Sequence, residues 1–279
     1  MQTSVEKSLI IIIFTLFLTG CSAKLVYNYA DWLIFWKIGD YVELNSEQKK
    51  VLENKVEELQ NWHRTEELPY YSALLKQLRN IVENRDEKEL AALFLQGPMI
   101  WQRSITKLSP EIIEFLTLLS TSQKQELITN IGSIQQETNE KWLKEIEDGN
   151  QQRIEDAEQR IEDYVGKLTK KQKETLVIYE QQRPNIIPLR IEGRKRWLTL
   201  FSKAILQDPE IDKTLVAKLL TDLSSHRSIK QQALTEQITQ LNLSKFRYLL
   251  KSMTDKQQSK LLIKIDDITK DIDQLSKQI

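Results

Sequence analysis

Leu168-Thr169-Lys170-Lys171-Gln172 is the clearest of four similar stretches that decide the fold. In each, an Asn, Ser or Thr follows an apolar residue and precedes a Gln by three positions. The first side chain can accept a hydrogen bond from a first-turn amide, and the Gln can reach back to the cap, as in a capping box. A Leu follows each Gln by four positions. The chain therefore predicts four helix starts of one design, the other three being Leu44-Asn45-Ser46-Glu47-Gln48, Leu119-Ser120-Thr121-Ser122-Gln123 and Met253-Thr254-Asp255-Lys256-Gln257.

The stretch between the second and third of these starts has the pattern of one long helix. From Ser120 to Leu168 no proline occurs, and apolar residues recur every three or four positions. This spacing predicts a helix of about 45 residues, on the order of 70 Å long, which Gly149 can bend because glycine weakens a helix interior. The other face is polar and charged, so we expect antiparallel pairing with further helices.

Composition extends the helical prediction to the whole chain. Only 7 Gly and 6 Pro occur in 279 residues, and no strand-like alternation stands out. Ser109-Pro110 and Asp208-Pro209 predict two further starts, with Pro in the first turn. The expected fold is all-α, an elongated multi-helix body of paired long helices. Its expected parts are a lipoprotein signal peptide at 1–20, a lipid anchor and aromatic helix at 21–45, a long-helix body at 46–183 and a C-terminal helical half at 184–279, with a boundary near Pro184–Pro188.

The N-terminal residues Leu18-Thr19-Gly20-Cys21 close an apolar run that begins at Leu9. A run of about ten residues is too short to span a bilayer, which needs about 20, and has the length of a signal-peptide core. The four residues resemble the lipobox of bacterial lipoproteins. This resemblance implies cleavage before Cys21 and its acylation, for example with palmitate; Ser22 implies the outer membrane, facing the periplasm. A signal peptide with an unrelated cysteine is the alternative.

The stretch from Lys24 to Ile38 is the most aromatic in the chain, and it follows the cysteine directly. It can form an interfacial helix, with Trp and Tyr at the level of the lipid headgroups. It can instead form a core helix around which the body folds. The second interpretation is favoured, because clustered aromatic residues usually anchor packing.

Charge, cysteine content and motifs exclude several function classes. Lys plus Arg and Asp plus Glu both number 40, which argues against nucleic-acid binding. Cys21 is the only cysteine, so intramolecular disulfides are excluded. No phosphate loop or nucleophile elbow occurs. His63 and Glu66 have the spacing of half a bundle metal site, but a histidine at a helix kink, hydrogen-bonded to a carboxylate or to the backbone, is favoured. We expect no enzyme activity, no cofactor and no metal.

Arg190, Arg194, Trp197 and Phe201 form one stripe, with spacings of four, three and four. An arginine stripe that leads into aromatic residues can bind anionic headgroups, cell-wall carboxylates or an acidic protein. The favoured alternative is ion pairing with Glu on a neighbouring helix, because the chain is neutral overall.

The helix starts also carry a resemblance to a family of periplasmic stress chaperones of the spheroplast-protein-Y type. Leu168-Thr169-Lys170-Lys171-Gln172 matches the LTxxQ motif of that family, and the stretches that end at Gln123 and Gln257 match with one change each. Members of that family are small, all-helical, cradle-shaped dimers that hold unfolded clients without ATP. The resemblance implies a holdase-like function, although this chain is larger, neutral and carries the lipobox.

A second resemblance covers nearly the whole chain. Tyr29-Ala30-Asp31-Trp32-Leu33, the start at Gln48 and the stretch from Trp62 to Tyr71 resemble an uncharacterised family of proteobacterial all-helical lipoproteins. That resemblance implies localisation and fold, and it implies no activity.

Together these features predict a non-enzymatic lipoprotein held in the outer membrane through Cys21 and facing the periplasm. We expect it to bind proteins or peptides through a helical surface, as a holdase-like chaperone does. The alternative is a structural or assembly lipoprotein that docks one specific outer-membrane or cell-wall partner. A promiscuous site needs adaptable apolar contacts, whereas a fixed partner needs a few anchor residues.

Overall fold

The computed structural model describes residues 27, 29–147, 149–222 and 224–278. Every regular element within these ranges is a helix, so the predicted all-α class is confirmed. No helix in this part of the chain combines the length and the apolar character that a bilayer span requires. Cys21 and the preceding Leu18, Thr19 and Gly20 lie outside the described residues.

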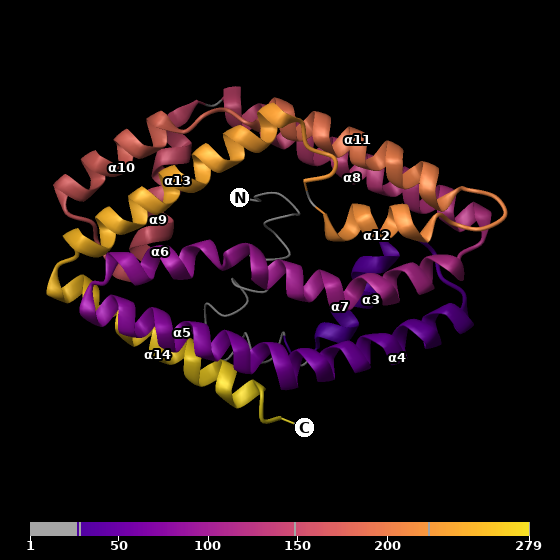
Figure 1. Ribbon diagram of the computed structural model, residues 1–279, viewed down its shortest axis with the longest axis horizontal. Coiled ribbons are helices and arrows are strands. Elements are labelled where there is room, and N and C mark those ends of the chain that lie inside the picture. The colour runs from indigo at the N-terminus through magenta and orange to yellow at the C-terminus, as the bar shows by residue number, and fades with distance from the viewer. Residues whose placement is uncertain (1–26, 28, 148, 223, 279) are drawn as a thin grey trace. The chain divides into compact units, whose positions relative to one another are not determined.

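The helices follow one another through short connections, as Figure 1 shows. Their bounds are α3 Ala30–Gly39, α4 Ser46–Trp62, the π-helix η1 His63–Glu67, α5 Leu68–Asn84, α6 Glu87–Leu95, α7 Gly97–Thr117, α8 Thr121–Glu147, α9 Asn150–Val165, α10 Lys170–Gln182, α11 Ile187–Ile205, α12 Lys213–Thr221, α13 Ile229–Ser252 and α14 Asp255–Leu275.

The chain divides into two compact units, and each collects three stretches that are separated in sequence. Of the residues that the structure describes, unit 1 comprises those within 27–63, 98–140 and 187–232, and unit 2 comprises those within 64–97, 141–186 and 233–278. The chain therefore leaves each unit and returns to it, and one of these crossings lies between residues 186 and 187. The expected parts at 46–183 and 184–279 stay a prediction.

Unit 1 has an apolar core that joins α3, α4, α7, α11 and α12. Its buried centre includes Ala204, Ile205 and Val216, none of which is accessible to solvent. Helix α3 contributes Ile34 and Ile38 to this core. Full burial of a side chain such as Ile205 or Val216 contributes about 1.5–3 kcal/mol to folding.

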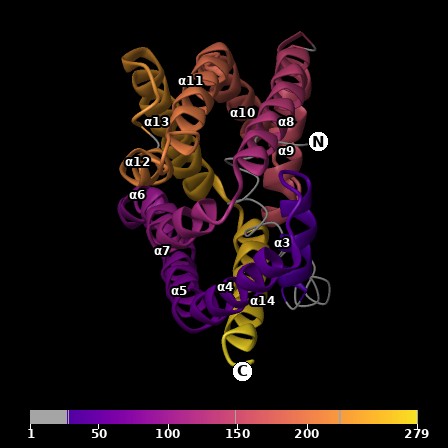
Figure 2. The same cartoon turned by 90° about the vertical axis from the view of Figure 1, so that its right-hand side faces the viewer.

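Unit 2 is built from antiparallel helix pairs, as the periodicity predicted. Helix α5 packs along α14 (Figures 1 and 2). The pairing is antiparallel because Ser72 meets Asp273 near one end, whereas Arg85 meets Asp255 at the other. Helices α9 and α10 also pack antiparallel, through ion pairs such as Lys173–Glu158.

The expected single helix between Ser120 and Leu168 is wrong, because it is broken into α8 and α9 at Gly149. Gly149 has φ +83° and ψ −174°, a conformation that essentially only glycine adopts. The expected start at Ser109-Pro110 is also wrong, since Pro110 lies inside α7. Helix α12 begins at Lys213, with Asp212 as its cap, rather than at Asp208-Pro209.

Candidate functional site

All four predicted helix starts form capping boxes. Asn45, Thr169 and Thr254 each accept from the backbone amide of the Gln three residues later, and that Gln accepts from the backbone amide of the cap. Ser120 and Gln123 make the same two bonds, of 3.2 and 3.0 Å. These bonds confirm the predicted chemistry of the motif.

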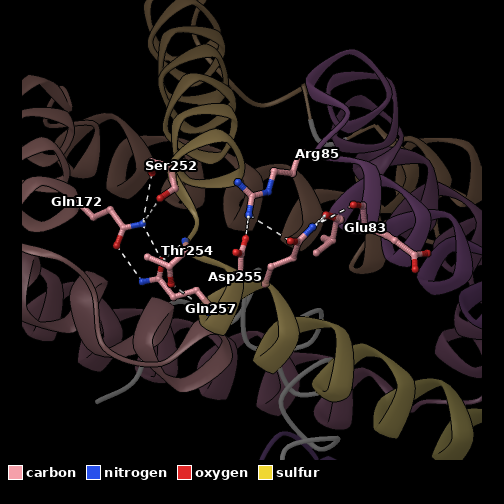
Figure 3. Close-up of polar contacts among 9 residues, drawn as sticks. Glu83, Arg85, Gln172, Ser252, Thr254, Asp255 and Gln257 are labelled. Atoms are coloured by element: carbon pink, nitrogen blue, oxygen red, sulfur yellow. Dashed lines mark hydrogen bonds and ion pairs between the residues drawn. The ribbon is translucent and has the colours of Figure 1, made fainter.

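The starts also meet in pairs, which sequence reasoning missed. In unit 2 the side-chain amides of Gln172 and Gln257 face each other (Figure 3). Gln172 Nε2 donates to Gln257 Oε1 at 3.0 Å, and Gln257 Nε2 donates back to Gln172 Oε1 at 2.9 Å. Their second hydrogens reach the carbonyls of Ser252 and Lys167, five residues before the opposite Gln. We call this four-bond arrangement the glutamine clasp.

Unit 1 contains a second glutamine clasp of the same geometry. Gln48 Nε2 donates to Gln123 Oε1 at 2.9 Å, and Gln123 Nε2 donates back at 2.7 Å. The remaining hydrogens reach the carbonyls of Leu118 and Glu43, again five residues before the opposite Gln. In each unit a glutamine clasp thus joins one pair of helix-start motifs. The two units therefore share the same arrangement at these helix starts.

The glutamine clasp satisfies every polar group of its amides. Each Gln uses two N–H donors, and its oxygen accepts from its own cap and from the partner amide. Gln172 and Gln257 are buried, with 1% and 4% of their surface exposed. A fully satisfied buried network of this kind specifies one arrangement of helices. The motif therefore has a structural role in joining helix starts.

In unit 2 the start of α14 is tied to a third helix as well. Arg85 Nη2 donates to Asp255 Oδ1 at 3.0 Å (Figure 3). Gln258 Nε2 donates to the carbonyls of Val82 and Glu83 at the C-terminal end of α5, at 2.7 and 3.0 Å. The first turn of α14 is therefore hydrogen-bonded both to the C-terminal end of α5 and to the first turn of α10.

Unit 1 also holds an apolar pocket of about 330 Å³. Trp197 and Phe201 form part of its wall, and so does Ile112 on α7. Its lining also includes Tyr41, Lys55 and Glu111, and Lys55 Nζ pairs with Glu111 at 2.5 Å and with Glu114 at 2.7 Å. These carboxylates, by hydrogen bonding, raise the pKa of Lys55. The pocket thus has a mainly apolar lining, and the positive charge of Lys55 is balanced by two carboxylates.

The predicted arginine stripe contributes its aromatic half to this pocket. Trp197 stacks on Phe201 with ring centres 4.8 Å apart, and Trp197 Nε1 donates to the carbonyl of Leu219 at 3.1 Å. Phe201 is buried, whereas Arg190 and Arg194 are half-buried. The four residues therefore lie partly in the interior of unit 1, and anion binding by the stripe stays a prediction.

Three cations surround one buried carboxylate in unit 2. Lys245 Nζ lies 2.8 Å from Glu180 Oε1, and Arg153 Nε and Arg183 Nη1 lie 3.6 and 3.8 Å from Oε2. The Glu180 side chain is only 3% exposed. Burial lowers the pKa of the Arg183 guanidinium, and the positive charges of Arg153 and Arg160 lower it further. Sequence spacing did not predict this cluster, because its residues come from α9, α10 and α13.

His63 lies at a helix irregularity, as expected, but the hydrogen-bond partner shown is a tyrosine hydroxyl, whereas a carboxylate or the backbone was expected. It is the first residue of the π-helix η1, and its Nδ1 is hydrogen-bonded to the Tyr27 hydroxyl at 3.0 Å. Among the described residues no group of three or more His, Cys, Asp or Glu is arranged to hold a metal ion.

Comparison with known proteins places the chain in a family and adds no activity. Neither a curated protein nor a solved structure matches it significantly. A family of unknown function, DUF6279, matches residues 40–231. Because this match covers more than half of the 279 residues, the chain belongs to the DUF6279 family.

Proposed function

We propose that this chain is a lipid-anchored envelope protein that binds apolar segments of unfolding proteins without catalysis. The observation that carries the proposal is the apolar pocket of unit 1, whose wall includes Ile112, Trp197 and Phe201. Its volume of about 330 Å³ lies at the lower end of the range of ligand pockets. A space of this size suits one or two apolar side chains of a client.

The chemistry of the pocket favours an unselective client site over a substrate site. A substrate site needs a few placed polar groups that fix orientation. Here Lys55, a cation in the lining, is already ion-paired with Glu111 and Glu114. An apolar wall with no free charge accepts many apolar side chains, as a promiscuous binder requires.

The lipobox-like residues Leu18-Thr19-Gly20-Cys21 support the anchoring part of the proposal. Acylation of Cys21 with several chains would hold the body firmly at a membrane, since one chain alone binds only marginally. By the resemblance to bacterial lipoproteins, the proposed location is the periplasmic face of the outer membrane. Mass spectrometry of the N-terminal peptide of the purified protein would test this part separately.

The test of client binding uses the full acylated protein in vesicles, without nucleotide. Aggregation of several unrelated unfolding proteins would be followed by light scattering at near-stoichiometric amounts of chaperone. Ile112→Trp fills the pocket and is expected to abolish suppression. Ile178→Trp changes a residue of unit 2 that is 53% exposed, and it should leave suppression unchanged.

The outcome also decides between the two functions that the sequence allowed. Suppression of all clients by wild type, and its loss in folded Ile112→Trp, is the expected result. No suppression of any client would contradict the chaperone function and favour an assembly lipoprotein with one fixed partner. Crosslinking in cells would then identify that partner.

A further inference from the structure

Helix α3 has two faces with large apolar residues, of which one packs against the core of unit 1 and the other is exposed. Ile34, Phe35 and Ile38 pack against the core of unit 1. Tyr29, Trp32 and Trp36 are 61%, 61% and 60% exposed. Both tryptophans lie two residues from Ile34, about 200° around the helix and so on its far side. One face of the aromatic stretch therefore packs in the core, as the favoured interpretation expected, and the other face is exposed, where contact with lipid stays a prediction.

The exposed aromatic residues form one stripe along the helix. Tyr29, Trp32 and Trp36 are spaced by three and four residues, which brings side chains onto one face. Exposed large aromatic rings in a row are unusual for a surface that faces only water. We call these three residues the aromatic stripe of α3.

Helix α3 is held firmly in unit 1, so the aromatic stripe has a fixed direction. Before its first turn, the Tyr27 carbonyl accepts from Gln60 Nε2 at 3.0 Å, and the Tyr27 hydroxyl is bonded to His63. After its last turn, the Tyr41 carbonyl accepts from Asn130 Nδ2 at 2.9 Å. These bonds orient the helix before any partner binds.

The residue types of the stripe match a lipid–water interface. Trp and Tyr concentrate at headgroup level in membranes, because each ring is apolar and also carries a polar group. Lys37 lies beside them, with Nζ 6.0 Å from the centre of the Trp36 ring and 2.7 Å from Asp40 Oδ2. Helix α3 has ten residues, about 15 Å in length, so it can lie on a bilayer but cannot cross its core of about 30 Å.

We propose that the aromatic stripe of α3 inserts into the headgroup region of the membrane and orients unit 1 on its surface. This inference rests on the proposed anchoring through Cys21. Tyr29 follows Cys21 by eight positions, and extended chain spans at most about 3.6 Å per residue, so the two residues are at most about 29 Å apart. An acylated Cys21 would therefore keep the stripe within reach of the bilayer.

The test uses the acylated protein in phosphatidylethanolamine–phosphatidylglycerol vesicles. Cys21 is the only cysteine of the chain, so after its acylation an introduced cysteine is the only free thiol. Trp32→Cys and, separately, Trp36→Cys would carry an environment-sensitive fluorophore. Lys50→Cys, at an exposed position on α4, is the matched control. Flotation reports vesicle binding independently of the label.

Insertion predicts a blue-shifted emission at positions 32 and 36 in vesicles, quenching there by brominated lipids, and neither change at position 50. The inference would be overturned if the protein binds vesicles but the labels at positions 32 and 36 emit as in water, like the label at position 50. A blue shift that depends on protein concentration instead of lipid would also overturn it, since a second copy would then cover the stripe.

The experiment distinguishes a protein that is not acylated at Cys21 from one whose aromatic stripe does not insert into the membrane. If mass spectrometry finds Cys21 unmodified, the labelled variants are prepared again with Cys21→Ser, so that the introduced cysteine is the only thiol. In that protein, lipid-dependent quenching at positions 32 and 36 would still support insertion, whereas aqueous labels would overturn it. The aggregation assay tests client binding independently of both results.

Discussion

Gln172 and Gln257, 85 residues apart, donate to each other through both side-chain amides in the interior of unit 2. Gln48 and Gln123, 75 residues apart, do the same in unit 1. In both units the second N–H of each Gln reaches the carbonyl five residues before the opposite Gln. A helix-start motif thereby serves as the tertiary contact that joins distant segments.

Removing one side of the unit 2 clasp should destabilise the protein strongly. Gln172→Ala leaves the Ser252 carbonyl, the Thr169 amide and part of the Gln257 amide without partners. Because a buried unpaired group costs about 1–3 kcal/mol, we expect a loss of about 2–4 kcal/mol in the free energy of unfolding. Urea denaturation followed by circular dichroism measures it.

Two comparisons make the clasp prediction specific. Gln151→Ala changes an exposed Gln whose side-chain amide donates to Glu155 on its own helix, and we expect a change of about 0.5 kcal/mol or less. Gln172→Ala and Gln257→Ala should be clearly non-additive, since both remove the same bonds. Additive effects, or an effect at position 172 as small as at 151, would contradict the clasp.

Glu180→Gln should be more harmful than the loss of one of its cations. The substitution leaves Arg153, Arg183 and Lys245 close together without a compensating charge, and breaking a buried ion pair costs about 3–5 kcal/mol. Lys245→Met leaves Glu180 with two guanidinium groups, so its cost should be smaller. Urea unfolding of both variants gives the order, and the reverse order would refute this account.

The matched control for Glu180 is a surface pair of the same unit. Glu83 is 53% exposed and pairs with Arg79 at 2.8 Å, four residues earlier on α5. Glu83→Gln should change the free energy of unfolding by about 0.5 kcal/mol or less, because solvent screens exposed pairs.

Protonation of Asp273 should account for part of the stability that unit 2 loses at low pH. The Ser72 hydroxyl donates to Asp273 Oδ1 at 2.5 Å, and this bond, with a smaller contribution from Lys76, lowers the pKa of Asp273. A folded-state pKa below the unfolded value of about 3.9 stabilises the fold above that pH. The contribution is lost as the pH falls through the lowered value.

Ser72→Ala should therefore raise the pKa of Asp273 towards its ordinary value. The free energy of unfolding that Asp273 contributes, and that is lost on acidification, should then be smaller. Carboxyl-carbon NMR titration of Asp273 in both proteins measures the shift. Lys76→Met should raise the pKa less, and its effect should fade with salt because Lys76 is 61% exposed. An Asp273 titration that is indifferent to Ser72→Ala would rule out the proposed cause.

Gly149→Ala should destabilise the protein because the break between α8 and α9 needs φ +83° at this residue. A conformation of this kind costs a residue with a Cβ about 1–3 kcal/mol. Gly132→Ala, inside α8, should instead stabilise by about 0.5–1 kcal/mol. Its new Cβ meets only Leu198 Cδ2, at 3.5 Å. Melting temperatures that move in the same direction would contradict the distinction.

Local chemistry made much of the helical fold predictable. A side chain at a cap can bond only to amides within its own first turn, so Thr169 with Gln172 and Thr254 with Gln257 predicted helix starts that the structure confirms. Periodicity predicted the antiparallel pairing of helices. The local chemistry of caps and first-turn prolines was misleading at Ser109-Pro110, because α7 runs on through Pro110.

The sequence by itself determined the helical class, the four capped starts and the short apolar run that ends at Cys21, because each depends on neighbours within a few residues. Only the tertiary structure decided which starts meet, how three stretches form each unit, and which face of α3 is exposed. Those outcomes depend on contacts between residues as distant as Gln172 and Gln257. Spacing along the chain does not encode such contacts, because many pairings bury the same apolar faces.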